Sequence, residues 1–119
     1  MRDTESLKKS ESFRRVYRSG RSRANRLLVM YVRKNGRDGN RLGIPVSKKV
    51  GNSVVRHRLT RLIRESYRLS EARYKKGYDI VVIARVHARD CTYFEIDRAM
   101  EHLAGMHGIL GEKDEDHHD

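Results

Sequence analysis

Hydrophobic and polar residues alternate along the chain in patterns that change from helical spacing to short apolar runs. Residues 10–20 (SESFRRVYRSG) show helical spacing and predict a short helix, with Ser10 as its N-cap and Gly20 as its stop signal. The apolar face of this helix consists of Phe13, Val16 and Tyr17.

Two apolar runs follow and predict strands. Residues 26–34 (RLLVMYVRK) are rich in β-branched and aromatic residues, and residues 41–47 (RLGIPVS) form a second run after the turn-rich segment 35–40. We therefore expect a β-hairpin. Because Pro45 lacks a backbone N–H, the second strand is expected to be an edge strand or to end near this residue.

The second half of the chain predicts a helix, a strand and a further helix. A turn at 51–53 (GNS) supplies an N-cap for a helix from about 54 to 71, and the apolar run 78–85 (YDIVVIAR) is typical of a strand buried on both faces. Thr92 and Glu95 have the spacing of a capping box. The apolar face of the last helix consists of Ile96, Ala99, Met100 and Leu103. A helix, two or three strands, a helix, a strand and a helix predict a mixed α+β domain with one small sheet.

The helix predicted over 54–71 has two opposite faces. At about 100° per residue, one face gathers the side chains that we assign to the core, Val55, Leu59, Leu62, Ile63 and Ser66. The opposite face is a narrow charged stripe of about 60° that holds His57, Arg61, Arg64 and Arg68, with Arg56 and Arg58 on its flanks.

The signs of these charges distinguish two interpretations of the stripe. A solvated face of an ordinary amphipathic helix usually mixes signs, because i,i+4 pairs of opposite charge support the helix. Here Arg61–Glu65 is the one such pair, whereas Arg64 and Arg68 repel each other. Arginine also presents a planar fork that suits phosphate oxygens and stacks on bases. We therefore favour a nucleic acid as partner over a purely solvated face.

The net charge strengthens this preference. Among 119 residues there are 27 Lys or Arg and 16 Asp or Glu, a formal charge of +11. Residues 112–119 hold five acids and one lysine, so residues 1–111 carry 26 basic against 11 acidic side chains. Such an excess concentrates polyanions. We expect one domain over 1–111 and an acidic tail over 112–119, either a disordered solubilising end or a weak competitor for the basic face.

Patterns for catalysis, metal binding or membrane insertion are weak. A single cysteine, Cys91, excludes an internal disulfide and favours a reduced, cytoplasmic setting. The N-terminus lacks the apolar run of a signal peptide, and no apolar run is long enough to span a bilayer. The six histidines form no HExxH pair. Asp79 and Asp90 are expected to orient loops, and Asp97 and Glu101 to be solvated, so nothing in the chain performs hydrolysis unaided.

Three other functions share parts of this pattern. A ribosomal-type RNA-binding protein would carry the same basic helix. An exposed aromatic cleft with affinity for single strands would argue against this alternative. A transcription factor would need a second helix next to the basic one at a short turn, and more Asn or Gln side chains to read bases. A membrane-surface protein would need the apolar side of the helix, which the core uses.

The order of residues around the arginine helix resembles a known family. RHRLTRLIRE (56–65) closely resembles the arginine-rich signature of the protein subunit of bacterial ribonuclease P, and KKVGNSV (48–54) matches the KKxGNxV segment that precedes it there. The likeness extends from about residue 7 to about residue 110. It includes FRRVYRSGRSRANRLLVMYV, RLGIPVSKK and YDIVVIAR.

The resemblance implies a fold and a division of labour. The family's fold has αβββαβα order with a left-handed βαβ crossover, against the usual right-handed rule, as in the second domain of a ribosomal protein. In the family, an RNA subunit with bound Mg²⁺ hydrolyses the phosphodiester that frees the 5′ end of mature tRNA. The expected partners of the protein are therefore ribonuclease P RNA and precursor tRNA, in a 1:1 complex with a monomeric protein and away from membranes. Mg²⁺ is expected to be bound mainly by the RNA.

Carried over position by position, the resemblance assigns two groups of residues and no catalytic or metal-binding one. The residues expected to bind RNA are Arg56, His57, Arg58, Arg61, Arg64 and Arg68, with Lys48, Lys49 and Asn52 beside them. The residues expected to line a cleft for the 5′ leader are Phe13, Tyr17, Val29 and Tyr31. From the residues alone this aromatic set also fits a plain core, and the resemblance favours a surface that stacks bases.

Two positions depart from the family's pattern. His57 stands where asparagine is usual, so a contact of this residue with RNA would be sensitive to pH. Thr60 stands where lysine or arginine is usual, which removes one charge from the basic face.

Overall fold

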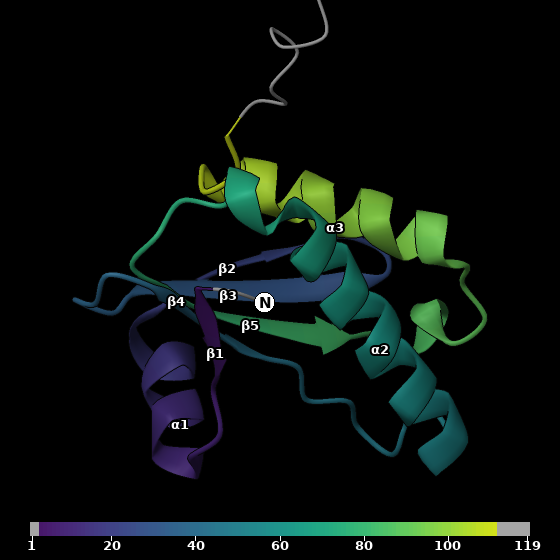
Figure 1. Ribbon diagram of the computed structural model, residues 1–119. Helices are drawn as coiled ribbons and strands as arrows, with labels where there is room; N and C mark the ends of the chain where they lie inside the picture. The colour runs from purple at the N-terminus through teal and green to yellow at the C-terminus, as the bar shows by residue number, and fades with distance from the viewer. Residues whose placement is uncertain (1–2, 112–119) are drawn as a thin grey trace, which may run out of the picture.

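The computed structural model describes residues 3–111 and shows one sheet covered on both faces (Figure 1). The strands are β1 (Thr4–Ser6), β2 (Arg21–Ala24), β3 (Leu28–Lys34), β4 (Asn40–Gly43) and β5 (Tyr78–Ala84). The helices are α1 (Ser10–Ser19), α2 (Ser53–Ser70) and α3 (Tyr93–His107), with short 3₁₀ turns at Glu71–Arg73 and Val86–Ala88. Helix α1 covers one face of the sheet, and α2 and α3 cover the other. The mixed α+β class predicted from the sequence is confirmed.

The strand order, β1-β4-β5-β3-β2, corrects the predicted hairpin. The segments 26–34 and 41–47 do not pair with each other, because β5 lies between β3 and β4. Strand β3 pairs antiparallel with β2 and with β5, while β4 pairs in parallel with β5. The hairpin of this fold is therefore β2–β3, which residues 21–24 form with the strand that follows them.

Strand β4 ends at Gly43, two residues before Pro45, as the missing proline N–H predicts. It is not an edge strand, because the three-residue strand β1 pairs with its other side in parallel. Strand β1 was not predicted from the sequence. Three residues with the pattern Thr-Glu-Ser carry no apolar alternation that would predict a strand.

Parallel neighbours cannot be joined by a tight turn, so the chain between β4 and β5 has to cross the sheet. Helix α2 makes this crossing and returns the chain to β5 beside β4. The βαβ unit that the resemblance implied is thus present. Its left-handed winding stays an expectation from the family.

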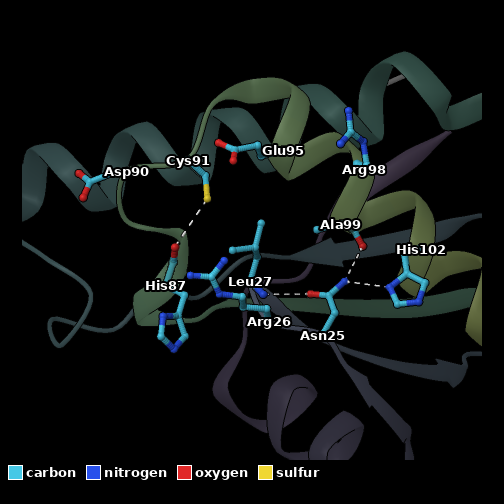
Figure 2. A pocket seen from close by; sticks show the side chains of 10 residues that line it. All are labelled: Asn25, Arg26, Leu27, His87, Asp90, Cys91, Glu95, Arg98, Ala99 and His102. Carbon is cyan, nitrogen blue, oxygen red and sulfur yellow. Dashed lines mark hydrogen bonds between the residues drawn. The ribbon is translucent and has the colours of Figure 1, made fainter.

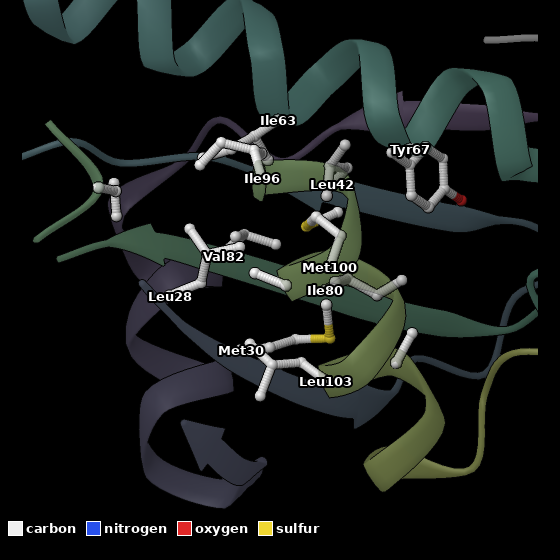
Figure 3. Packing of buried hydrophobic residues seen from close by; sticks show 14 of the residues in the cluster. Leu28, Met30, Leu42, Ile63, Tyr67, Ile80, Val82, Ile96, Met100 and Leu103 are labelled. Carbon is white, nitrogen blue, oxygen red and sulfur yellow. The ribbon is translucent and has the colours of Figure 1, made fainter. Parts of the chain in front are cut away.

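The main core lies between the sheet and the pair α2 and α3 (Figure 3). Because side chains alternate along a strand, Leu28, Met30 and Val32 of β3 face these helices, while Val29 and Tyr31 face the α1 side. The helices contribute the apolar residues that the sequence analysis assigned to the core, including Leu59, Ile63, Ile96, Met100 and Leu103. A smaller cluster on the α1 side contains Leu7, Val16 and Val81.

The helix ends agree with the predicted signals except at α1. Asn52 caps α2 by accepting a hydrogen bond from the Val55 N–H, and Thr92 and Glu95 form the predicted capping box of α3. For α1, the N-cap is Lys9 rather than Ser10, and its side chain makes no capping bond. Gly20 follows the last turn of α1, as predicted.

A chain of buried polar groups connects β1 and β4 to the end of α2. The Thr4 hydroxyl lies 2.7 Å from the Tyr67 hydroxyl and donates to a Glu71 carboxylate oxygen, also at 2.7 Å. Asn40 donates to the same Tyr67 hydroxyl at 3.1 Å, and its side-chain oxygen accepts from the Tyr78 N–H. Because each buried group has a partner, the network stabilises the otherwise short β1 at the sheet edge.

The structure shows what each of the carboxylates Asp79, Asp97 and Glu101 contacts. Asp79 is buried and accepts two hydrogen bonds from Arg41, at 2.8 and 2.7 Å. Burial alone would raise the pKa of Asp79, but the bonds from Arg41 and Asn35 lower it overall. The predicted solvation holds for Glu101, which is exposed and pairs with Arg73 at the surface, but not for Asp97, which is partly buried and accepts a hydrogen bond from Ser66 at 2.6 Å.

The sequence also predicted that no segment spans a membrane and that the chain ends in an acidic tail. No helix among residues 3–111 is long and apolar enough to cross a membrane. The predicted acidic tail, 112–119, lies outside the described residues.

His107, in the last turn of α3, joins this helix to the sheet. Its Nε2 lies 2.8 Å from the Met30 carbonyl oxygen, which only accepts, so Nε2 carries the proton and donates. Its Nδ1 is buried and has no hydrogen-bond partner among the described residues. Burial, together with the nearby Arg21 and Arg23, lowers the pKa of His107, while the bond to Met30 opposes this shift.

A lowered pKa in the folded state makes stability depend on pH. Below a pH of about 6.5 the unfolded chain binds a proton at this histidine before the folded protein does, so the free energy of unfolding falls as the pH drops through this range. We expect urea denaturation between pH 7.5 and 5.5 to show this loss. His107→Leu should flatten the dependence, whereas the control His87→Gln, at an exposed position, should retain it. An unchanged pH dependence in His107→Leu would contradict the assignment.

Candidate nucleic-acid interface

Helix α2 presents the predicted charged stripe to the solvent. Its inner side is fixed by the buried side chains of Leu59, Ile63, Ser66 and Tyr67. The side chains that it exposes include His57, Arg58, Arg61, Arg64 and Arg68, while Arg56 is half-buried. We call these six residues the arginine face.

Two members of the arginine face are attached to backbone carbonyls. Arg58 donates to the Cys91 carbonyl at 2.5 Å and, more weakly, to the Arg89 carbonyl at 3.5 Å, so it ties α2 to the segment before α3. The Arg56 Nε donates to the Gly51 carbonyl at 3.2 Å. These bonds hold both guanidinium groups in place and use part of their donor capacity.

Glu65 pairs with a different arginine from the one that the spacing predicted. Its carboxylate accepts two hydrogen bonds from Arg68, at 2.9 and 2.8 Å, rather than pairing with Arg61. These bonds lower the pKa of Glu65 and raise the pKa of Arg68. The pair is exposed and contributes little to stability, but it reduces the repulsion between Arg68 and Arg64.

Arg61 and Arg64 are the exposed arginines of α2 for which the described residues supply no ion pair or hydrogen bond. Both lie on the middle of a helix that the core holds rigid. Arg61 also lines two open hollows beside α2 with Arg58. Their guanidinium groups are therefore the most available donors for phosphate on this face.

The segment before α2 places two lysines next to this face. Lys48 and Lys49 are exposed, while Val50 is buried and anchors the segment to the core. Gly51 lies so close to Val55 that an added Cβ would be 2.8 Å from the valine Cβ. Asn52, predicted to lie beside RNA, uses its side-chain oxygen as the cap of α2 and keeps its amide group for other contacts.

The two departures from the family's pattern have different surroundings. The Thr60 hydroxyl donates to the Arg56 carbonyl at 3.0 Å, so this residue is satisfied within the helix and adds no charge. His57 is exposed and lines a hollow with Ser53, Val54 and Arg61.

The aromatic residues predicted for the leader cleft come together on the other side of the sheet. The Tyr17 ring lies 5.0 Å from the Tyr31 ring, edge to face, and 6.4 Å from the Phe13 ring. Val29 precedes Tyr31 by two residues and lies on the same face of β3. We call Phe13, Tyr17, Val29 and Tyr31 the aromatic surface.

The aromatic surface is partly exposed rather than a closed core. Tyr17 is 40% exposed, and the other three residues are of intermediate exposure. Phe13 rests directly on β4, where an added Cβ at Gly43 would lie 2.6 Å from its ring. Partial burial, with a smaller effect of Tyr31, raises the pKa of Tyr17, so its hydroxyl stays protonated and can donate.

Ile83 extends this surface, although its sequence pattern did not predict it there. It lies opposite Val29 in the β3–β5 pairing and packs, partly buried, against the small cluster on the α1 side. The apolar run 78–85 was interpreted as buried on both faces, and this holds for Val81 but not for Ile83. The position of Ile83 beside Val29 depends on the pairing of β3 with β5, which a local sequence pattern does not reveal.

A separate open pocket of about 570 Å³ lies between the β2–β3 turn and the start of α3 (Figure 2). It contains none of the predicted site residues. Cys91 lies there, buried, with its thiol directed to the His87 carbonyl at 3.6 Å. Burial raises the pKa of Cys91, which disfavours a nucleophilic thiolate. Within residues 3–111, no three His, Cys, Asp or Glu side chains are grouped so that they could hold a metal ion.

The fold and these surfaces define a class, a small basic α+β domain with an arginine face on one side of its sheet and an aromatic surface on the other. Comparison with known proteins gives the family. Residues 1–107 match the Ribonuclease P family. The chain belongs to the family of ribonuclease P protein components.

Individual relatives cover nearly the whole chain. The ribonuclease P protein component of Lachnoclostridium phytofermentans is 55% identical over 113 residues, which are 95% of this chain and 97% of the relative. The structure of the Staphylococcus aureus RNase P protein superposes with a TM-score of 0.83 at 39% identity, covering 89% of this chain and 97% of that one. The Thermotoga maritima RNase P protein gives a TM-score of 0.80 at 32% identity, covering 86% and 96%.

The different surroundings of the arginines predict different effects of their removal. We expect Arg61→Ala or Arg64→Ala to weaken RNA binding and to reduce the slope of log K against log salt by about 0.7–0.9, the loss of one phosphate contact. Neither change should lower thermal stability, because neither side chain has a hydrogen-bond or ion-pair partner within residues 3–111. Salt titrations of binding to a ribonuclease P RNA transcript measure the slope. Arg58→Ala is the comparison, and it should lower the Tm as well because it breaks the tie to Cys91.

The partial exposure of Tyr17 predicts that binding and folding can be separated at this residue. Tyr17→Ala should weaken binding of a single-stranded 5′ leader by about 1–3 kcal/mol, the value of one stacked base. Circular dichroism should show a folded domain. Val16→Ala, at the fully buried neighbour, is the control that should lower stability. Unchanged leader affinity in folded Tyr17→Ala would remove this residue from the interface.

Proposed function

We propose that the chain is the protein subunit of a ribonuclease P holoenzyme. In this proposal it binds the catalytic RNA subunit and the 5′ leader of precursor tRNA, and it promotes the endonucleolytic step that generates the mature tRNA 5′ end. Membership of the family of ribonuclease P protein components supports this role.

The observation that carries the proposal is the exposed arginine face on a helix whose other side is locked in the core. Arg61 and Arg64 lack partners among the described residues, although like charges on one face repel. An external polyanion supplies the missing negative charge. Because the helix is rigid, several guanidinium groups meet neighbouring phosphates with little loss of backbone entropy.

The aromatic surface supports the second part of the proposal. Tyr17 and Tyr31 form an edge-to-face pair that is open to solvent at Tyr17. Unpaired bases stack on such rings, whereas bases inside a duplex are not available to them. A single-stranded leader is therefore the part of the substrate that suits this surface, and it would lie on the sheet face opposite to the arginine face.

The chemistry in this proposal belongs to the RNA. Mg²⁺ supplies the activation of water and of the scissile phosphate and is held mainly by the RNA subunit. The protein contributes binding and orientation of the RNA and the leader, as a monomer in a 1:1 complex in the cytoplasm. A ribosomal-type RNA-binding protein would share the arginine face, but it would not need the aromatic surface.

Cleavage of a 5′-labelled precursor tRNA tests the proposal. The protein alone should be inactive at near-physiological Mg²⁺, and it should strongly stimulate correct cleavage by a bacterial ribonuclease P RNA. The double variant Arg61→Ala/Arg64→Ala should lose most of this stimulation, with partial recovery at lower salt. Tight RNA binding without any stimulation of cleavage would instead favour a general RNA-binding protein.

A further inference from the structure

Phe94 is 73% exposed at the start of α3, although large apolar side chains in a domain with few aromatics are expected inside. It is one of two phenylalanines in a chain without tryptophan. The capping box places it in the first turn of α3, so its position is fixed by a well-defined helix end. Its ring lies 5.6 Å from the Tyr93 ring at an interplanar angle of 73°.

This aromatic pair borders the arginine face. Arg58 donates to the Cys91 carbonyl, two residues before Tyr93, and thereby holds the start of α3 against α2. Burial, followed by the charges of Asp97 and Glu65, raises the pKa of Tyr93, and Arg68 opposes this shift, so the phenol lies within electrostatic range of the Glu65–Arg68 pair. The exposed ring of Phe94 is thus attached, through Tyr93, to the edge of the surface that the arginines occupy.

The surroundings suit RNA better than a purely apolar partner. The hollow next to this edge has a volume of about 570 Å³ and is lined by Arg58, Arg61, Leu62 and Glu65. Three carboxylates near this edge already have partners: Glu95 accepts from the Thr92 N–H, Asp97 from Ser66 and Glu65 from Arg68. An apolar partner would have to bury these charges, whereas a nucleotide offers a flat base for the ring and a phosphate for the arginines.

We propose that Phe94, supported by Tyr93, is a stacking platform for one unpaired nucleobase of the RNA whose phosphates bind the arginine face. The inference rests on the proposed function and deepens it, because it adds a base contact to a phosphate surface. It also places the unpaired nucleotide at the exposed edge of the arginine face, next to the start of α3.

The absence of tryptophan from the chain allows a direct test. Phe94→Trp places a single tryptophan at the platform, and its fluorescence should be quenched when a bacterial ribonuclease P RNA transcript is added. The matched control is Met106→Trp, an exposed apolar position on the same helix about 18 Å further along at 1.5 Å per residue. Its emission should stay unchanged.

Affinity provides the second measurement. Phe94→Ala should weaken binding of the same RNA by about 5- to 150-fold, the loss of one stacked base, with the salt slope unchanged because no phosphate contact is removed. Arg61→Ala should change the slope instead. Phe94→Trp should bind at least as tightly as the original chain, and Met106→Ala should bind equally well.

The outcomes separate the two proposals. If the unsubstituted chain binds the RNA with its full salt slope but Phe94→Ala binds equally tightly, or Phe94→Trp is not quenched, the stacking platform is wrong and the proposed function stands. If the unsubstituted chain does not bind the RNA, both are wrong. Quenching that depends on protein concentration without RNA would assign the platform to a second copy of the chain and overturn the inference.

Discussion

The position of β5 between β3 and β4 is the constraint on which the rest of the structure depends. Its seven-residue antiparallel pairing with β3 and its parallel pairing with β4 make it the central strand. Because β4 and β5 are parallel, the chain between them must cross the sheet, and α2 makes this crossing. The alternation of β5 then directs Ile80 and Val82 towards α2 and α3, and Val81 and Ile83 towards α1. Both candidate surfaces follow from this arrangement.

The exposed residues of both surfaces are held in place by buried residues of the same helices. Tyr67 is a buried residue of α2, and its hydroxyl is hydrogen-bonded to the Thr4 hydroxyl of β1. The helix that carries the arginine face therefore also holds the edge strand β1. On the other side, Val16 packs inside while Tyr17, the next residue of α1, lies open beside Tyr31. Each surface is therefore positioned by its immediate neighbours in the sequence, which explains why Tyr17 and Val16 are expected to respond differently to substitution.

The elements with strong local signals were predictable from the sequence, and those that depend on pairing were not. Helix α2, the capping box at Thr92 and the two faces of α2 follow from 3.6-residue spacing and local hydrogen bonds. The hairpin prediction failed because adjacency in sequence favoured β3 with β4, while the partner of both lies more than 30 residues further on. The Glu65–Arg68 pair and the tie of Arg58 to Cys91 also depend on rotamers and tertiary packing. The resemblance predicted which residues form the aromatic surface, but not the place of Ile83 in it.

The charge on α2 is tolerated because burial outweighs repulsion. A like-charge i,i+4 pair such as Arg64 and Arg68 costs a helix about 0.2–0.5 kcal/mol, whereas full burial of Leu59 and of Ile63 contributes about 1.5–3 kcal/mol each. Glu65 lowers the cost further by pairing with Arg68. The helix is thus stable without an external anion, and its arginines stay exposed in a fixed arrangement. Because this face is preformed, it loses little conformational entropy when phosphates replace the water around it. Charges on a flexible tail would lose more, which is the physical advantage of placing them on a core helix.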